Sequence, residues 1–351
     1  MSSTPLTAPH ALDDVPCHDP YVLAVEGGYL LYTSYDSARW ERQVPEGTAT
    51  DYPAPPGTGV LAWWSPDLVR WGSPRAVFQV PEGAWADPSV APWAPEVHLV
   101  NGVHVLATTL HNPADRLPEV AQRTTRIAMS SSGWGDFTPV RRGTVLAVST
   151  AGPLGPFELL DPRGPHTPAA FMALDGTVTR DEHGAPWMVY AHEWVQTVDG
   201  TMEAVPLDED LRVIGDPVHL FRGSEASWYR SIAPAAAALA PYVTDGPQLW
   251  PLPGGALAMI WASYRPGGSF TAGEYVETQA ISRSGSLLGP WEQGPVLVGG
   301  NAGHGMLLTT HEGDLVLVLH RGMGTPRVRA EVHDVVATAE GLRVTGQRGA
   351  A

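Results

Sequence analysis

The sequence predicts an all-β fold, a five-bladed β-propeller with four-stranded antiparallel blades, which forms a single domain over residues 1–351. One hairpin-like unit recurs five times, with a small acidic or polar motif, an apolar stretch, a glycine-containing turn and a second apolar stretch. The chain contains 38 Gly and 34 Pro at short intervals, as is typical of turn-rich β-proteins. Long helical periodicity is nearly absent. The five units span residues 18–34, 94–111, 174–193, 244–264 and 303–321.

A second hairpin-like segment follows each of these units. Two hairpins make a four-stranded sheet, and several such sheets around an axis make a propeller. Propellers often close by pairing an N-terminal segment with the last blade, and residues 1–16 are the candidate for this role. An alanine-rich stretch at 233–240 is the candidate for a short helix. The second segments span residues 65–71, 151–159, 207–215, 284–294 and 334–344.

An ionisable residue begins the first strand of every unit. The innermost strands of a propeller run parallel around the axis, so these residues are expected to meet at one mouth. A β-sandwich of ordinary hairpins is the alternative fold, but it would not need the same class of residue at every start. The five residues are Asp19, Glu96, Asp175, Asp245 and His304.

Composition excludes several classes of partner. The formal net charge of −16 disfavours binding to phosphate backbones, so nucleic acid is not expected as a partner. No apolar run approaches the roughly 20 residues of a membrane span. The N-terminus has neither a basic region nor an apolar region of a signal peptide, and Cys17 has no second cysteine to pair with. These features predict a cytoplasmic protein, and the acidic charge does not disfavour a neutral carbohydrate as its partner.

Five short motifs stand in order at the blade spacing, and together they resemble glycoside hydrolase family 43 over nearly the whole chain. That resemblance implies a five-bladed propeller and an inverting mechanism. It implies that Asp19 is the general base and that Asp175 modulates the pKa of the general acid and has an orienting role. It also places the general acid at Asp245, where the family usually has Glu. The motifs are His18-Asp19-Pro20, Trp93-Ala94-Pro95-Glu96, Leu174-Asp175-Gly176, Asp245-Gly246-Pro247 and Gly303-His304-Gly305.

Two residues compete for the role of general acid. An inverting glycosidase needs one carboxylate to activate water and one carboxylic acid to protonate the leaving oxygen. The repeat register favours Asp245, whose side chain is one methylene shorter than the glutamate of the family. The second strand of each hairpin returns to the mouth, which places Glu193 close to Asp175 with a longer reach. Both assignments stay open at this level.

Several further residues are predicted to contact a sugar. Trp93, Trp194 and Tyr264 offer flat apolar faces and polar tips to a sugar ring. Arg321 is expected to donate to hydroxyls or to hold a carboxylate in place. The full predicted set is His18, Trp93, Glu96, His192, Trp194, Tyr264, His304 and Arg321.

No cofactor is expected, and the sequence contains no zinc cluster, phosphate loop or nucleophile elbow. In the family that the chain resembles, a cation or a water molecule can occupy the axial channel beside the histidine matched by His304. One histidine does not define a metal site, because calcium prefers oxygen ligands. Cys17 is expected to fill a small apolar space. Trp63, Trp64, Trp71 and Trp261 are expected to be structural.

The predicted activity is that of an inverting, exo-acting glycoside hydrolase that releases terminal arabinofuranose or galactofuranose. Insertions at 44–58 and 264–272 are expected near the mouth, where they would close it into a pocket suited to chain ends. A β-xylosidase of the same family is one alternative. A catalytically silent sugar-binding propeller is another, because aspartate replaces glutamate at position 245.

Overall fold

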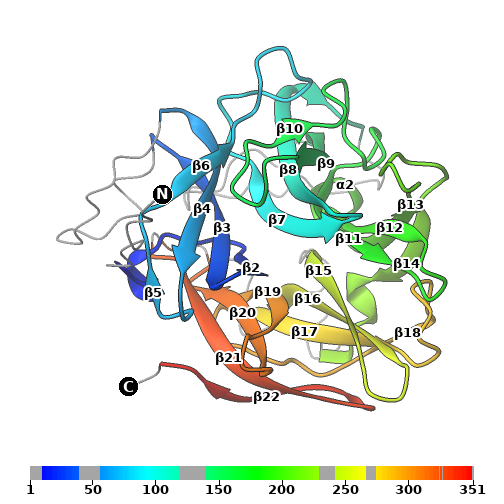
Figure 1. The fold of residues 1–351 in the computed structure, drawn as a ribbon. Helices are drawn as coiled ribbons and strands as arrows, with labels where there is room; N and C mark the ends of the chain where they lie inside the picture. The colour runs from blue at the N-terminus through cyan, green and yellow to red at the C-terminus, as the bar shows by residue number, and fades with distance from the viewer. Residues whose placement is uncertain are drawn as a thin grey trace.

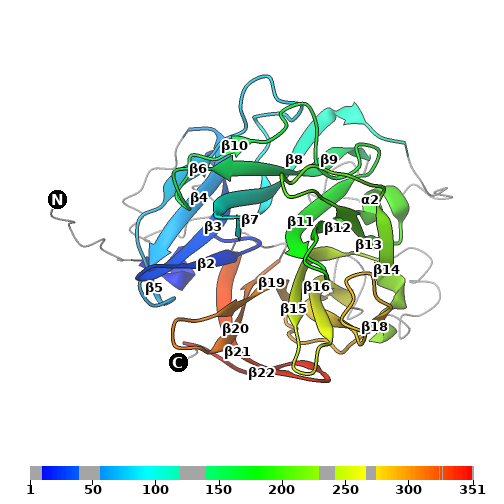
Figure 2. The same ribbon diagram turned by 45° about the vertical axis from the view of Figure 1, so that its right-hand side comes forward.

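The computed structural model describes residues 10–38, 56–118, 139–228, 242–265, 274–323, 325 and 327–349. Five four-stranded antiparallel sheets form a ring (Figures 1 and 2), which confirms the predicted five-bladed propeller. The candidate helix at 233–240 lies outside the described residues, as do most of the two insertions expected near the mouth.

Within each blade the strands lie side by side in chain order. The innermost strands are β2 (Tyr21–Val25), β7 (Trp93–Val100), β11 (Ala173–Arg180), β15 (Asp245–Pro251) and β19 (Ala302–Thr309). The second strands are β3 (Gly28–Asp36), β8 (Val103–Arg116), β12 (Pro186–His192), β16 (Leu257–Arg265) and β20 (Leu315–Arg321). The third strands are β4 (Thr58–Ser65), β9 (Val140–Ser149), β13 (Thr201–Pro206), β17 (Glu274–Ser282) and β21 (Arg329–Thr338). The outer strands are β6 (Arg75–Phe78), β10 (Glu158–Leu159), β14 (Val218–Arg222), β18 (Trp291–Gln293) and β22 (Gly341–Gln347).

The hairpins expected from the repeat are therefore present in every blade. Each of the five leading units forms the innermost and second strands, and each later segment covers all or part of the connection between the third and outer strands. The second strands are buried along most of their length, because each blade packs face to face against its neighbours. Trp63, Trp71 and Trp261 are almost completely buried in this packing, and Trp64 packs against the same core, which confirms their structural role.

The ring closes differently from the prediction. The innermost strands β19 and β2 contact each other directly, and blade five takes all four of its strands from the C-terminal part of the chain. The short strand β1 (His10–Ala11) pairs with β5 (Arg70–Trp71) beside blade one, while the 3-10 helix η1 (Leu12–Asp14) packs against β21. The expected pairing of the N-terminal segment with the last blade is therefore wrong for the described residues from His10 onward. Because β22 already supplies the fourth strand of blade five, the N-terminal segment lies across the junction of blades one and five. It adds no strand to the four-stranded sheet of either blade.

A backbone irregularity begins the innermost strand of each blade. In blades two to five the register with the second strand shifts there, as it does at a β-bulge. One residue at this point has a left-handed φ in every blade, including blade one, where it lies just before β2. These residues are Asp19 (+49°), Ala94 (+44°), Asp175 (+57°), Gly246 (+54°) and His304 (+51°).

This position corrects the predicted set of lead residues. Asp19, Asp175 and His304 are structurally equivalent, but Asp245 precedes the equivalent position by one residue and Glu96 follows it by two. A bulge inserts an extra residue without changing the apolar pattern that follows it. Matching the five repeats by residue type alone therefore misplaces a lead residue by one or two positions.

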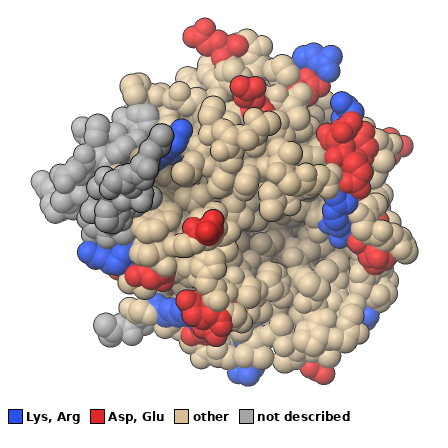
Figure 3. All heavy atoms as spheres, in the orientation of Figure 1, with Lys and Arg blue, Asp and Glu red and all other residues tan. Residues whose placement is uncertain are grey.

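No helix among the described residues is long and apolar enough to cross a membrane. On the face shown in Figure 3, arginine side chains lie apart from one another with acidic side chains among them. This face therefore presents no continuous basic surface over the described residues.

We expect Gly246→Ala to destabilise the fold more than Gly184→Ala. Both glycines have left-handed φ angles, of +54° and +83°, so both variants carry the same backbone strain of about 1–2 kcal/mol. A Cβ at Gly246 would lie 2.7 Å from Cδ2 of His304, whereas a Cβ at Gly184 would have no neighbour within 4 Å. The clash should lower the free energy of unfolding by about 1–3 kcal/mol more in Gly246→Ala. Urea unfolding followed by tryptophan fluorescence measures both, and equal losses would contradict the packing at the mouth.

Candidate active site

His304 joins two carboxylates that come from distant parts of the chain. Its Nδ1 lies 3.2 Å from Oδ1 of Asp19 and 3.7 Å from Oδ2 of Asp175. The two carboxylate oxygens can therefore be no farther apart than the sum of these distances. Asp19 belongs to blade one, Asp175 to blade three and His304 to blade five, so the left-handed starts of three innermost strands bring them together.

The backbone of the bulges is held by side chains of the preceding blade. A bulge leaves N–H groups unpaired with its own sheet, and a buried N–H needs an acceptor. In four blades a side chain from the neighbouring blade accepts one of them. These hydrogen bonds run from Asp19 N–H to His320 Nδ1 (3.0 Å), from Asp175 N–H to Thr109 Oγ1 (2.8 Å), from Gly246 N–H to Asp175 Oδ2 (3.2 Å) and from Gly305 N–H to Glu277 Oε2 (2.8 Å).

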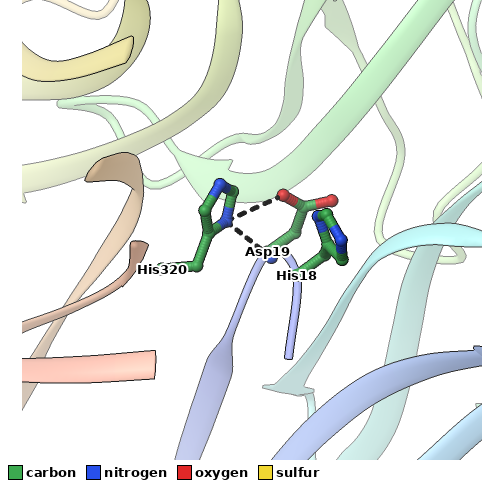
Figure 4. A group of neighbouring side chains, drawn as sticks. All are labelled: His18, Asp19 and His320. Carbon is green, nitrogen blue, oxygen red and sulfur yellow. Dashed lines mark hydrogen bonds and ion pairs between the residues drawn. The ribbon is translucent and has the colours of Figure 1, made fainter. Parts of the chain in front are cut away.

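His18, Asp19 and His320 lie together at the mouth (Figure 4), and their ligand atoms lie within 4.8 Å of one another. The backbone N–H of Asp19 is a fixed donor, so Nδ1 of His320 must accept from it. That use of its lone pair removes Nδ1 as a metal ligand, and the other ring nitrogen points away from Asp19 (Figure 4). Two protein ligands remain, which is fewer than the three or four of a zinc site. The three residues therefore do not fit a zinc site, and an axial ion near His304 stays a prediction.

Burial and neighbouring charges separate the pKa values of the three aspartates. Burial raises the pKa of Asp175, and the carboxyl groups of Asp245 and Asp19 raise it further. Burial, followed by the charge of Glu193, raises the pKa of Asp245 to about 8. Burial also raises the pKa of Asp19, but the His304 imidazole beside it opposes this effect most strongly, and the pKa stays below its usual value. At neutral pH Asp19 is therefore ionised and Asp245 is protonated.

Arg142 of β9 connects Glu193 to an aromatic side chain at the mouth. Its Nη1 forms an ion pair with Oε2 of Glu193, and its Nε–H donates to Nδ1 of His111 at 3.0 Å. The guanidinium carbon lies 4.2 Å from the centroid of the Trp93 ring, while that ring is 41% exposed. Burial raises the pKa of Glu193, and the positive charge of Arg142 opposes this rise. Trp93 thus has a rigid, charged support and an open surface.

Two of the predicted sugar contacts lie in the interior. The ring of His192 stacks on Phe171 at a centroid distance of 4.0 Å, and its Nε2 shares a hydrogen bond with Oε1 of Gln196 at 2.7 Å. Trp194 begins the short helix α2 (Trp194–Thr197) and packs against Met172. After Glu193 this helix turns the chain inward and buries both side chains, and the role of His192 and Trp194 as substrate contacts stays a prediction.

The remaining predicted contacts are held by neighbouring side chains. Glu96 is buried and lies 2.8 Å from Nε2 of His98. Arg321 donates through Nε to Glu331 at 2.5 Å, as part of a half-exposed ion pair. Tyr264 is half-buried, and its ring lies 4.9 Å from the ring of Tyr275. Burial, followed by the charge of His320, lowers the pKa of His18 to about 4.

The third strands contribute residues to the mouth that none of the sequence motifs indicated. Arg142 and Thr144 lie two apart on β9, and Tyr275 and Glu277 lie two apart on β17. Residues two apart on a strand face the same side, so each pair projects together. Polar or aromatic residues at alternate positions of an otherwise apolar strand are the signal that could have identified them.

The chain is similar to several known glycoside hydrolases. A family model for glycosyl hydrolases family 43 matches residues 14–336. An endo-arabinase from Bacteroides thetaiotaomicron has 28% sequence identity and a TM-score of 0.71, over 95% of this chain and 98% of that one. An endo-1,4-beta-xylanase from the same organism has 18% identity and a TM-score of 0.65, over 95% and 96% of the two chains. An alpha-L-arabinofuranosidase from Lactobacillus brevis has 14% identity and a TM-score of 0.64, over 95% and 94%. No curated protein sequence matches the chain.

We expect Arg142→Met to destabilise the protein in a pH-dependent way. Without the guanidinium, Glu193 is a buried carboxyl whose pKa rises further above its usual value. A carboxyl with a raised pKa in the folded state costs little at low pH, where it is protonated, and destabilises as the pH rises. The loss should reach about 3–5 kcal/mol at pH 8 and shrink toward pH 5.

Arg141→Met is the matched control for this prediction, because Arg141 pairs with Asp115, which is 46% exposed. Its loss should stay below about 1 kcal/mol and should not depend on pH. Urea unfolding at pH 5 and pH 8 measures both variants. A loss in Arg142→Met that is the same at both pH values would contradict the pairing of Arg142 with Glu193.

Proposed function

The chain belongs to the glycosyl hydrolases of family 43, and from that premise we propose that it removes terminal arabinofuranose or galactofuranose from carbohydrate chains with inversion of configuration. Enzymes of this family hydrolyse O-glycosyl bonds, act on carbohydrates and work without a cofactor.

The observation that supports this mechanism is the opposite ionisation of two carboxyl groups at one mouth. Inversion needs an ionised base to activate water and a protonated acid to serve the leaving group. His304 and its neighbours keep Asp19 ionised, whereas burial and Glu193 keep Asp245 protonated up to a pH of about 8. Asp175 lies between them, since it contacts His304 and accepts the N–H of Gly246, the residue after Asp245.

In the proposed reaction, Asp19 takes a proton from a water molecule as the water oxygen attacks the anomeric carbon. Asp245 gives its proton to the glycosidic oxygen while the bond from that oxygen to the anomeric carbon breaks. The products are a free sugar of inverted configuration and a carbohydrate shortened by one unit. Proton exchange with solvent then restores the ionised Asp19 and the protonated Asp245.

The raised pKa of Asp175 follows from burial and its two acidic neighbours, and its backbone contacts favour a role in orientation.

The surroundings of Glu193 favour Asp245 as the acid. A guanidinium paired with a carboxyl group favours its ionised form, and Arg142 forms such a pair with Glu193. The charge of Glu193 in turn raises the pKa of Asp245. Glu193 therefore acts through Asp245 as a positioning residue in this proposal. Asp245 is one methylene shorter than the glutamate that the family usually has at this position. Activity on substrates with good and poor leaving groups tests whether it still serves as the acid.

The proposal of a furanose substrate is supported by the similarity to an endo-arabinase at 28% identity. Trp93 supplies an exposed aromatic surface beside the carboxyl groups, as sugar rings require. The same relative favours a second mode of action, cleavage within a chain, because its name is that of an endo-acting enzyme. The products from linear arabinan distinguish the two modes.

We expect the protein to release monosaccharide as the first product from linear arabinan, with an inverted anomeric centre in proton NMR. Asp19→Asn should lower kcat by about 10²–10⁴-fold because the variant lacks the base that activates water. Its thermal unfolding should show that it still folds. Longer first products would indicate endo action, and activity near wild type in Asp19→Asn would overturn the assignment of the base. Binding of arabinan without hydrolysis by the wild type would favour a catalytically silent propeller.

We expect Asp245→Asn and Glu193→Gln to differ on substrates with good and poor leaving groups. A good leaving group needs little protonation, so Asp245→Asn should recover on a nitrophenyl glycoside and lose about 10²–10⁴-fold on arabinan. Glu193→Gln should lose similar activity on both substrates.

Their pH profiles provide a second measurement. An acid with a raised pKa supports activity at low pH, so wild-type activity should fall as the pH rises through about 8. Asp245→Asn should lose this alkaline limb. Glu193→Gln should move it to lower pH, because the charge that raises the pKa of Asp245 is removed. The reverse pattern would identify Glu193 as the acid.

A further inference from the structure

Tyr275 is a buried residue at the mouth that takes no part in the proton transfers proposed for Asp19 and Asp245. It lies on β17, the third strand of blade four, and its side chain is inaccessible to solvent. Its ring lies parallel to that of His320, at a centroid distance of 5.6 Å and an angle of 7°. A Cβ added to Gly303 would lie 2.7 Å from Cε1 of this ring, so glycine is needed there to admit it. The ring is therefore held between two blades in one orientation.

The hydroxyl of Tyr275 donates a hydrogen bond to Oδ2 of Asp245 at 3.0 Å. Burial, followed by the charge of Asp245, raises the pKa of Tyr275 well above its usual value, so the phenol keeps its proton at any pH at which the enzyme works. Among the described residues, Asp245 supplies the acceptor for this hydroxyl. A buried hydroxyl turned away from its acceptor is unfavourable, so the direction of the bond is set.

We propose that Tyr275 is the positioning residue of the general acid, which directs the transferable proton to Oδ1 of Asp245 by occupying Oδ2. This inference rests on the proposed role of Asp245. When the carboxyl group gives up its proton, the hydrogen bond to Oδ2 becomes charge-assisted and stabilises the carboxylate that forms. Tyr275 thus fixes where the proton leaves and lowers the energy of the group that remains.

The position of Tyr275 also links the acid to the base. Its ring stacks on His320, and Nδ1 of His320 accepts the N–H of Asp19. A displacement of the tyrosine ring would therefore move both the carboxyl group of Asp245 and His320, which holds the backbone of Asp19. A rigid connection of this kind keeps two groups at the separation that an intervening water molecule requires.

Tyr275→Phe tests the proposal because it removes the hydroxyl and keeps the ring. On arabinan, which has a poor leaving group, kcat should fall by about 10- to 100-fold, the range expected for losing a hydrogen bond to a charged group. On a nitrophenyl glycoside the loss should be about 3-fold or less, since little protonation is needed there. The alkaline limb of the pH profile should move to higher pH, because the hydroxyl that favours the carboxylate form of Asp245 is gone.

Tyr190→Phe is the matched control. Tyr190 is a fully buried tyrosine of blade three, and its hydroxyl has no hydrogen-bond partner among the described residues. We expect this variant to match the wild type in both activities and in its pH profile. Equal losses on both substrates in Tyr275→Phe, with the alkaline limb unmoved, would reduce Tyr275 to a structural role and overturn the proposal.

A measurement that needs no activity separates this proposal from the proposed function. Carbon-13 NMR of aspartate-labelled protein follows the titration of Asp245, and Asp245→Asn assigns its signal. In Tyr275→Phe the titration should move to higher pH, even if the wild type cleaves none of the tested glycosides. An unchanged titration would overturn the proposal for Tyr275, while absent hydrolysis by the wild type would count against the proposed function alone.

Discussion

In four of the five blades, hydrogen bonds tie the left-handed start of the innermost strand to the preceding blade, and the mouth of this propeller depends on them. The left-handed residues at the bulges turn backbone N–H groups out of their own sheets, toward acceptors such as His320, Thr109 and Glu277. Every such bond joins two blades, so it sets the rotation of one blade against the next. Because the same left-handed positions carry Asp19, Asp175 and His304, the packing of the ring also sets the geometry of the carboxyl groups.

Burial alone would make all the acidic groups at the mouth alike, since it raises the pKa of every carboxyl group. Their neighbours make them different. Asp19 lies against the His304 imidazole, which favours its charge, whereas the charge of Glu193 disfavours a charge on Asp245. A ring of blades suits this division, because each carboxyl group faces a different neighbouring blade. One fold can thus hold a base and an acid close together, with partners such as Arg142 fixing the charge of the groups around them.

The fold and part of the site were predictable from the sequence for physical reasons. Hairpins leave a local signal, in which apolar strands alternate with glycine-rich turns, so the five units and their second segments were all located correctly. Asp19, Asp175 and His304 could be grouped because they recur at one point of that repeat. Asp245 and Glu96 were assigned to the same position, and the bulges show that they occupy different ones. His192 and Trp194 were placed at the mouth by strand direction, which does not reveal the inward turn of α2.

By itself, then, the sequence determined the number of blades, the order of the strands and the group of acidic residues that meet near the axis, because these follow from patterns within single hairpins. Only the tertiary structure decided which carboxyl group is charged, which residues hold the bulges and how the ring closes. Those outcomes depend on contacts between blades, such as Arg142 with Glu193 and Tyr275 with His320. Contacts of this kind join residues far apart in the chain, where no local pattern records the pairing.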